Sequence, residues 1–305
     1  MVVFIIHYFF SSEHFIIIDD DISNQSGGVP MDYSQYSLAK TGYLKEDFRL
    51  FHINDRTDRE FEWHYHDFHK IIVFVSGKVT YHIEGKAYQL KPQDILLVSQ
   101  GAIHKPEIDP SIPYERYIFW IRDDLSFPEL NTCFQKANDR SFNLIRLDSA
   151  LQEKLKDLLP EIEHSLHDAQ FGDSILSKAL FTQFMVYINR IFLKSSTAPD
   201  QKSYSSDSQV EQLLKYINRN LSENLSIDHL AERFFFSKYH MMRKFKKETG
   251  YTIHNYIISK RLLHARSLIA QGTPVMKAAI QSGFQDYTAF VRAYKKQFGT
   301  VPTQR

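Results

Sequence analysis

Residues 225–247 read LSIDHLAERFFFSKYHMMRKFKK, a pattern that predicts two short helices separated by a tight turn. Ser226 can cap the first helix and Ser237 the second, and the apolar residues of each helix recur on one face. Gly250 then supplies a helix stop. Because the second helix is rich in cations, the pair is typical of a helix-turn-helix motif, which presents its second helix to the major groove of DNA.

Residues 273–299 read TPVMKAAIQSGFQDYTAFVRAYKKQFG and repeat this arrangement. Thr273 predicts a cap followed by proline at the first helical position, Asp286 predicts a second cap, and Gly299 predicts a stop. Between the motifs, Ile253–Ala270 predicts one helix of about 27 Å, at 1.5 Å per residue. That length suits recognition helices in major-groove segments about 34 Å apart. An all-helical protein-interaction bundle is the alternative on pattern and charge alone.

The formal net charge of +1 is the sum of two opposite halves. Residues 209–305 hold 16 Lys and Arg against 6 Asp and Glu, a net charge of +10. Residues 1–208 hold the remaining 21 against 30, a net charge of −9. A basic domain attracts polyanions through counterion release, so we expect the carboxyl-terminal half to bind nucleic acid. A solvated cationic face without a partner is the alternative.

The composition also limits the cellular compartments in which we expect the protein to work. Cys133 is the only cysteine, which excludes an intrachain disulfide and a multi-cysteine zinc site. No apolar run approaches the ~20 residues of a membrane helix, and the apolar start lacks the positive flank of a signal peptide. We therefore expect a cytoplasmic protein with no membrane partner. Residues 1–30 differ from the rest, and we expect translation to begin at Met31; a genuine amino-terminal arm is the alternative.

The whole chain predicts an α+β protein. Short β-branched and aromatic runs between turn signals from about residue 47 to 122 indicate a small barrel or sandwich. Residues 149–194 have helical spacing, and the serine-rich residues 195–208 indicate a linker. We expect a barrel over 31–148, then helices that mediate dimerisation, the linker, and an all-α DNA-binding domain over 209–305 with two helix-turn-helix motifs.

Residues 225–305 resemble the DNA-binding domain of the AraC/XylS family of bacterial transcription regulators over its whole length. The matching residues occur in register and are Leu230-Ala231, Ser237, Phe245-Lys246-Lys247-Glu248-Thr249-Gly250, Arg261-Leu262, Ala265, Gly283-Phe284, Tyr294-Lys295-Lys296, Phe298-Gly299 and Pro302. The resemblance implies a transcription regulator, usually an activator, that binds double-stranded promoter DNA. The partners it implies are RNA polymerase and a second copy of the chain in a homodimer.

The resemblance also implies roles for single residues. The family's base-reading positions fall on Tyr239, Met242, Arg243, Tyr287, Thr288 and Arg292. Their chemistry agrees, because arginines can chelate guanine O6 and N7 while Tyr239 and Met242 can pack on thymine methyl groups. Six lysines are expected to contact phosphates, which position a protein without specifying sequence. They are Lys238, Lys246, Lys247, Lys277, Lys295 and Lys296.

The predicted strands resemble the cupin-type effector domain that is common in this family. Cupin enzymes hold a metal with two histidines in an H-x-H pattern, a glutamate four residues on, and a later histidine. This chain has His64, His66 and His104, but Lys70 occupies the glutamate position. A cation at that position disfavours a divalent metal, so we expect no metal and no other cofactor.

The same histidines are better suited to hydrogen bonding with a polar small molecule in the barrel mouth. The resemblance implies a sugar-like effector contacting His64, His66, His104 and Trp120; histidines that only brace strand ends are the alternative. We thus expect a one-component sensor, not an enzyme, whose effector shifts the population able to occupy both DNA half-sites. A cupin enzyme with an accessory DNA-binding tail and a ligand-free architectural DNA binder are the competing hypotheses.

Overall fold

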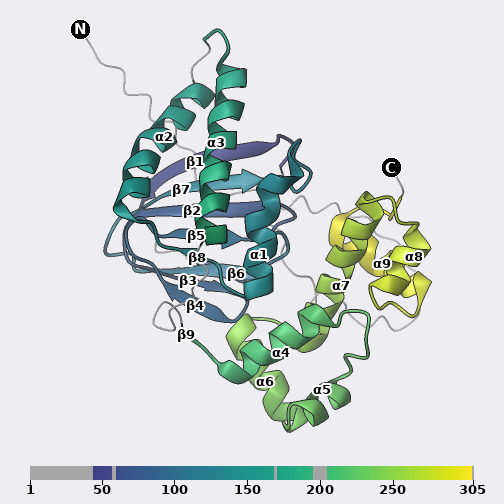
Figure 1. Ribbon diagram of the computed structural model, residues 1–305. Helices are drawn as coiled ribbons and strands as arrows, with labels where there is room; N and C mark the ends of the chain where they lie inside the picture. Colours follow the sequence, from purple (N-terminus) through teal and green to yellow (C-terminus); the bar gives the residue numbers. More distant parts are fainter. Residues whose placement is uncertain (1–43, 57–59, 168–169, 195–204, 304–305) are drawn as a thin grey trace, which may run out of the picture. The chain divides into compact units, whose positions relative to one another are not determined.

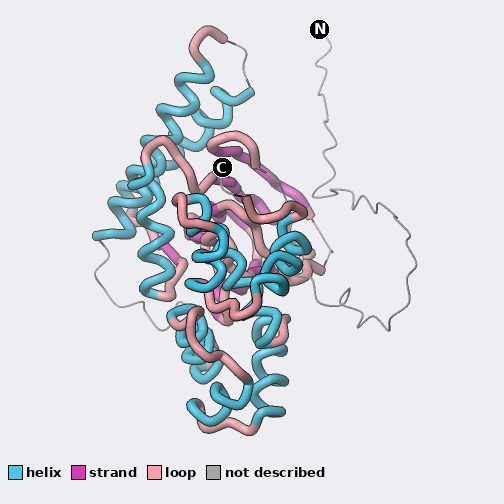
Figure 2. The backbone as a smooth tube through the Cα atoms, turned by 90° about the vertical axis from the view of Figure 1, so that its right-hand side faces the viewer, coloured by secondary structure: helices cyan, strands magenta, loops and turns pink. Residues whose placement is uncertain are grey.

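A computed structural model describes residues 44–56, 60–167, 170–194 and 205–303. The expected extension 1–30 and most of the expected linker lie outside the described residues. Within them, every strand precedes residue 207 and the chain from Ser208 onward is helical (Figure 1, Figure 2). The predicted α+β class, with a β-rich part followed by an all-helical part, is confirmed. No described helix is both long and apolar enough to cross a membrane.

The strands form two antiparallel sheets that face each other across a shared core. One sheet has the order β1-β7-β2-β5-β8 and the other β6-β3-β4-β9. Their bounds are Phe48–Asp55 (β1), His69–Ser76 (β2), Val79–Ile83 (β3), Lys86–Gln89 (β4), Ile95–Val98 (β5), His104–Ile108 (β6), Tyr114–Ile121 (β7), Leu144–Ile145 (β8) and Ser205–Ser206 (β9). The end of the expected linker is therefore a short strand, since β9 pairs with β4.

Strand β2 shows why the barrel strands appear in the sequence as continuous apolar runs and not as alternating apolar and polar residues. Ile71 and Val73 point to a core shared with the helices α2 (Ser149–His167) and α3 (Asp173–Lys194). Ile72 and Phe74 point the other way, into the core between the two sheets. Both faces are buried, so every position of the strand favours an apolar residue. Figure 1 shows α2 and α3 lying across the five-stranded sheet.

The described helices before the carboxyl-terminal part include one that the sequence analysis missed. Helix α1 (Thr132–Arg140) follows a 3-10 turn at Pro128–Asn131 and buries Cys133, Phe134 and Ala137 under the five-stranded sheet. The carboxyl-terminal helices are α4 (Ser208–Arg219), α5 (Ile227–Arg233), α6 (Lys238–Thr249), α7 (Ile253–Ala270), α8 (Val275–Gln281) and α9 (Tyr287–Phe298).

The caps expected in the two motifs are confirmed with one exception. The hydroxyl of Ser226 accepts from the amide of His229, and that of Ser237 from the amide of His240. Asp286 accepts from the amides of Thr288 and Ala289, which begins α9. At α8 the expectation is wrong by one residue. Pro274 itself is the cap position, Val275 begins the helix, and no side chain caps it.

Candidate functional site

Helix α6 presents its polar and cationic face to solvent. Met241 and Phe245 fix the opposite face in the core that α4 to α7 share. Tyr239 and Met242 are 72% and 40% exposed, respectively, large fractions for apolar side chains. Arg243 is also exposed, and its guanidinium carbon lies 5.9 Å from the centre of the Tyr239 ring. The three base readers expected in the first motif therefore share one solvent-facing surface.

Helix α9 repeats this division of faces. Phe290 and Tyr294 are buried in a second core, formed with α7 and α8. Tyr287, Thr288 and Arg292 are exposed on the other side. The structure thus places the six expected readers in two groups of three, one on each second helix of a motif. An exposed aromatic ring and an arginine in each group suit contacts with base edges in a major groove.

All six lysines expected to contact phosphates are exposed. Lys238 lies 2.5 Å from Asp228 across the first motif, with both side chains more than half exposed. Such an exposed ion pair stabilises little and can yield to a phosphate. Lys244, by contrast, contacts Asp207 at 2.8 Å and Gln209 at 2.7 Å. It attaches α6 to the start of α4, so its role in these contacts is structural.

The turn of the first motif contains a residue that sequence reasoning passed over. Phe235 is 96% exposed and has a positive φ of 54°, a conformation that bulky residues rarely adopt. It immediately precedes Phe236 and the Ser237 cap of the recognition helix. The run of three phenylalanines was the available signal, because three successive aromatics cannot all face one core.

The three histidines expected in the barrel lie together. The backbones of His64 and His104 are paired, with N–O distances of 3.1 and 3.0 Å, and the two ring centres are 4.4 Å apart. The His66 ring lies about 5 Å from both, and all three residues are buried. Nδ1 of His104 donates to the Ala102 carbonyl at 2.9 Å, and Nδ1 of His64 to the Glu62 carbonyl at 2.8 Å. Nε2 of His104, which has no hydrogen-bond partner among the described residues, is then an acceptor in the neutral ring.

Burial and the charges around the cluster favour a neutral His104. Burial, reinforced by the neighbouring His64, His66 and Lys70, holds the pKa of His104 well below its usual value of 6.5. Lys70 is itself buried, on β2 beside Trp120 of β7. Trp120 lies beside the histidine cluster, with its ring centre 6.0 Å from that of His66.

A divalent metal fits this cluster poorly. One nitrogen from each histidine lies within 4.8 Å of the others, and bonds from Nδ1 to carbonyls are how metal-binding histidines are oriented. However, Lys70 takes the sequence position of the usual glutamate ligand, and its charge opposes a positive charge on His104. A second cation would meet the same repulsion with only neutral donors to offset it.

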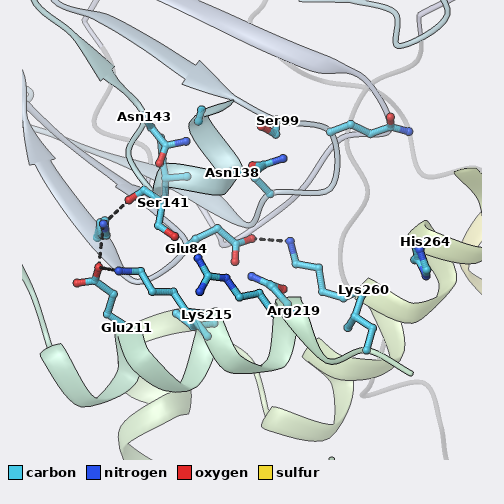
Figure 3. Close-up of a pocket in the computed structure, with 18 residues that line it drawn as sticks. Glu84, Ser99, Asn138, Ser141, Asn143, Glu211, Lys215, Arg219, Lys260 and His264 are labelled. Atoms are coloured by element: carbon cyan, nitrogen blue, oxygen red, sulfur yellow. Dashed lines mark hydrogen bonds and ion pairs between the residues drawn. The ribbon is translucent and has the colours of Figure 1, made fainter. Parts of the chain in front are cut away.

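A cavity of about 350 Å³ lies elsewhere, between the barrel and the helices α1, α4 and α7. From the barrel side it is lined by Glu84, Lys86 and Asn138, among others. Arg219 and Lys260 belong to its helical side, and Figure 3 shows these side chains around the cavity. Sequence reasoning missed it, because its lining residues are spread from Ile83 to His264 and share no motif.

Polar contacts attach the barrel to α7 beside this cavity. Glu84, in the turn between β3 and β4, accepts from Lys260 at 2.8 Å and from the Tyr256 hydroxyl. Arg266 donates to Asp67 at 3.0 Å. Burial and the Glu84 carboxylate raise the pKa of Tyr256 well above 10, so its hydroxyl stays a donor.

Apolar contacts extend the same interface towards the first motif. Ile103 of the barrel is buried in the core of α4 to α7, and Trp63 packs against it. The Tyr251 hydroxyl donates to the Trp63 carbonyl at 2.5 Å. Gly250, the residue that ends α6, lies so close that a Cβ there would be 2.1 Å from the Trp63 ring.

Two family models match the chain. Residues 49–185 match an AraC-like ligand binding domain, which spans the barrel, α1, α2 and part of α3. Residues 230–305 match a helix-turn-helix domain, which spans most of α5 and the helices that follow.

Curated relatives match over most of the chain. The HTH-type transcriptional activator RhaR of Mannheimia succiniciproducens is 23% identical over 80% of this chain and 86% of its own length. The activator RhaS of Escherichia coli is 21% identical over the same shares. Among solved structures, ToxT from Vibrio cholerae is 15% identical over 85% of this chain and 96% of its own, with a TM-score of 0.32. The DNA-binding domain of AdpA, in complex with a target DNA, is 26% identical over 32% of this chain and 87% of its own, with a TM-score of 0.30.

Proposed function

The chain belongs to the AraC family of transcription regulators, with a ligand-binding and a DNA-binding domain, and on that premise we propose a sequence-specific activator. It inserts α6 and α9 into adjacent major-groove segments of promoter DNA and responds to a small polar effector that is sugar-like in chemistry. It works as a homodimer that contacts RNA polymerase.

The observation that carries this proposal is the pair of equivalent exposed faces on α6 and α9. Each second helix buries two large apolar residues and leaves an aromatic ring and an arginine in solvent. The lysines expected at phosphates lie on α6, α8 and α9 and are exposed as well. Helix α7 spans 18 residues, about 27 Å at 1.5 Å per residue, which suits two motifs that follow one face of a duplex.

The histidine cluster is the proposed effector site. Nε2 of the neutral His104 offers an acceptor, and Trp120 lies beside the cluster with its ring centre 6.0 Å from that of His66. Hydroxyl groups of a sugar donate to such acceptors, while the ring face covers the C–H side of the sugar. Lys70 is buried on β2, opposite Trp120 of β7, and its ammonium is a hydrogen-bond donor.

Selection of bound sequences from a random DNA library tests the DNA-binding proposal. We expect each copy of the chain to select two half-sites whose centres are about 10 base pairs apart. Arg243→Ala removes the preference at one guanine in the first half-site, and Arg292→Ala does so in the second, because each arginine reads one segment. Arg56→Ala, an exposed arginine directly after β1, is the matched control and leaves the selected sequence unchanged. Selection of no common sequence, or loss of both preferences together, contradicts the proposal.

A thermal-shift measurement with neutral sugars tests the effector site. A sugar that binds only the folded chain raises the midpoint of unfolding. We expect this shift to disappear in His66→Gln and to persist in His82→Gln, whose ring lies outside the cluster and contacts Glu107 at 3.0 Å. A shift that persists in His66→Gln would show that the sugar binds at a site other than the histidine cluster.

A further inference from the structure

The cavity between barrel and helices is formed by two separate parts of the chain. Lys86 of β4 and Asn138 of α1 line it from one side. Lys215 and Arg219 of α4 and Lys260 of α7 line it from the other. Its volume of about 350 Å³ is at the lower end of the range for small-molecule sites, so it suits a ligand of monosaccharide size.

The charged groups of this cavity leave a surplus of cations. Its lining holds four cations, Lys86, Lys215, Arg219 and Lys260, against the carboxylates Glu84 and Glu211, a net charge of +2. A cleft lined by one sign of charge concentrates ions of the opposite sign.

The carboxylates already have partners. Glu211 contacts Lys86 at 3.0 Å and Lys215 at 2.8 Å, and Glu84 contacts Lys260 at 2.8 Å. Among the described residues no ion pair or hydrogen bond engages the Arg219 guanidinium, which projects from α4 between these pairs (Figure 3). Lys86 is held in place, since its ammonium also donates to the Ser141 carbonyl and its side chain is 4% exposed.

We propose that this cavity is a second ligand site, distinct from the histidine cluster, and that it binds a small organic anion of monosaccharide size. The anionic group, a carboxylate or a phosphate, pairs with Arg219 and with one of the flanking lysines. Arginine presents a planar fork of donors that matches either oxyanion. Asparagine and serine side chains in the lining, such as Asn138, supply donors and acceptors for hydroxyl groups.

Such a ligand contacts both parts of the interface. It pairs with cations of α4 and α7 while it touches β4 and α1, so it binds the docked arrangement of barrel and helices better than a separated one. A ligand shifts an equilibrium by its difference in affinity for the two states. The anion therefore holds α7, the helix between the two motifs, against the barrel.

Isothermal titration calorimetry on the full chain tests this site with D-glucuronate, D-glucose 6-phosphate and neutral D-glucose. We expect one anion to bind at least roughly tenfold more tightly than glucose, which is the scale of one added charge-assisted hydrogen bond. Glucuronate and glucose 6-phosphate distinguish a carboxylate site from a phosphate site. Arg219→Gln and Lys215→Gln each lower the affinity for the preferred anion by about tenfold. Lys156→Gln, an exposed lysine on α2, leaves it unchanged.

Two results would overturn the proposal. One is binding of neither anion more tightly than glucose in the His66→Gln variant, in which sugar binding at the histidine cluster is removed. The other is an equal loss in Lys156→Gln and Lys215→Gln, which would indicate general charge attraction. Failure of the proposed function is a separate outcome, because loss of promoter binding or of the His66-dependent sugar shift leaves the anion titration unaffected. His66→Gln therefore serves as the second control and is expected to retain the anion affinity.

Discussion

At the scale of single residues, His104 shows how the fold changes an ordinary side chain. The sequence predicted that it joins His64 and His66, and the structure brings the three rings together. It could not predict that the cluster is buried, because these residues come from different strands and loops. Burial and those positive neighbours lower the pKa of His104 in the folded state only.

That shift has a defined effect on stability. Below its usual pKa of 6.5, His104 takes up a proton in the unfolded chain but remains neutral in the folded one. The unfolded state then binds more protons, so we expect stability to fall as the pH drops below 6.5. His104→Gln removes this contribution and makes the unfolding midpoint less dependent on pH between 8 and 5. Identical pH profiles for the two proteins would show that His104 does not carry the effect.

At the scale of helices and strands, local signals predicted what local contacts determine. The caps at Ser226, Ser237 and Asp286 and the stops at Gly250 and Gly299 were readable, because each acts within one turn of its helix. Helix α1 could not be predicted from its own sequence. Its buried face is short and packs against the five-stranded sheet, whose strands lie elsewhere in the chain. Strand β9 was missed for the same reason, because its pairing partner lies over a hundred residues earlier.

Gly250 and Gly299 allow a matched test of the interface between barrel and helices. Both end a recognition helix with φ near +75°, so alanine at either site bears the cost of a left-handed conformation, about 1 kcal/mol. A Cβ at Gly250 also meets the Trp63 ring at 2.1 Å, whereas nothing lies within 4 Å of one at Gly299. We expect Gly250→Ala to lower the unfolding midpoint of the full chain more than Gly299→Ala does. In a Trp63→Ala background the difference should vanish; its persistence would argue against this contact.

At the scale of the whole molecule, the opposite charges of the two halves serve more than one purpose. The sequence predicted nucleic-acid binding from the net charge of +10 in residues 209–305. The structure shows that Lys260 and Arg266 of α7 instead contact Glu84 and Asp67 of the barrel. These pairs join residues more than 170 positions apart, so no local pattern reveals them. The exposed lysines and arginines of α6, α8 and α9 take no part in these two contacts, and they are the cations that we propose bind DNA.

The central claim is that these exposed cations and readers bind DNA, and the salt dependence of promoter affinity tests it most directly. For the full chain on its selected site, we expect the logarithm of affinity to fall linearly with that of salt, by about 0.9 per phosphate contact. Lys246→Ala should reduce the slope by about one and weaken all sequences alike. Arg243→Ala should cost roughly 1–3 kcal/mol on the selected site and little on random DNA. An affinity that does not depend on salt, or an equal loss on specific and random DNA for Arg243→Ala, would contradict the account.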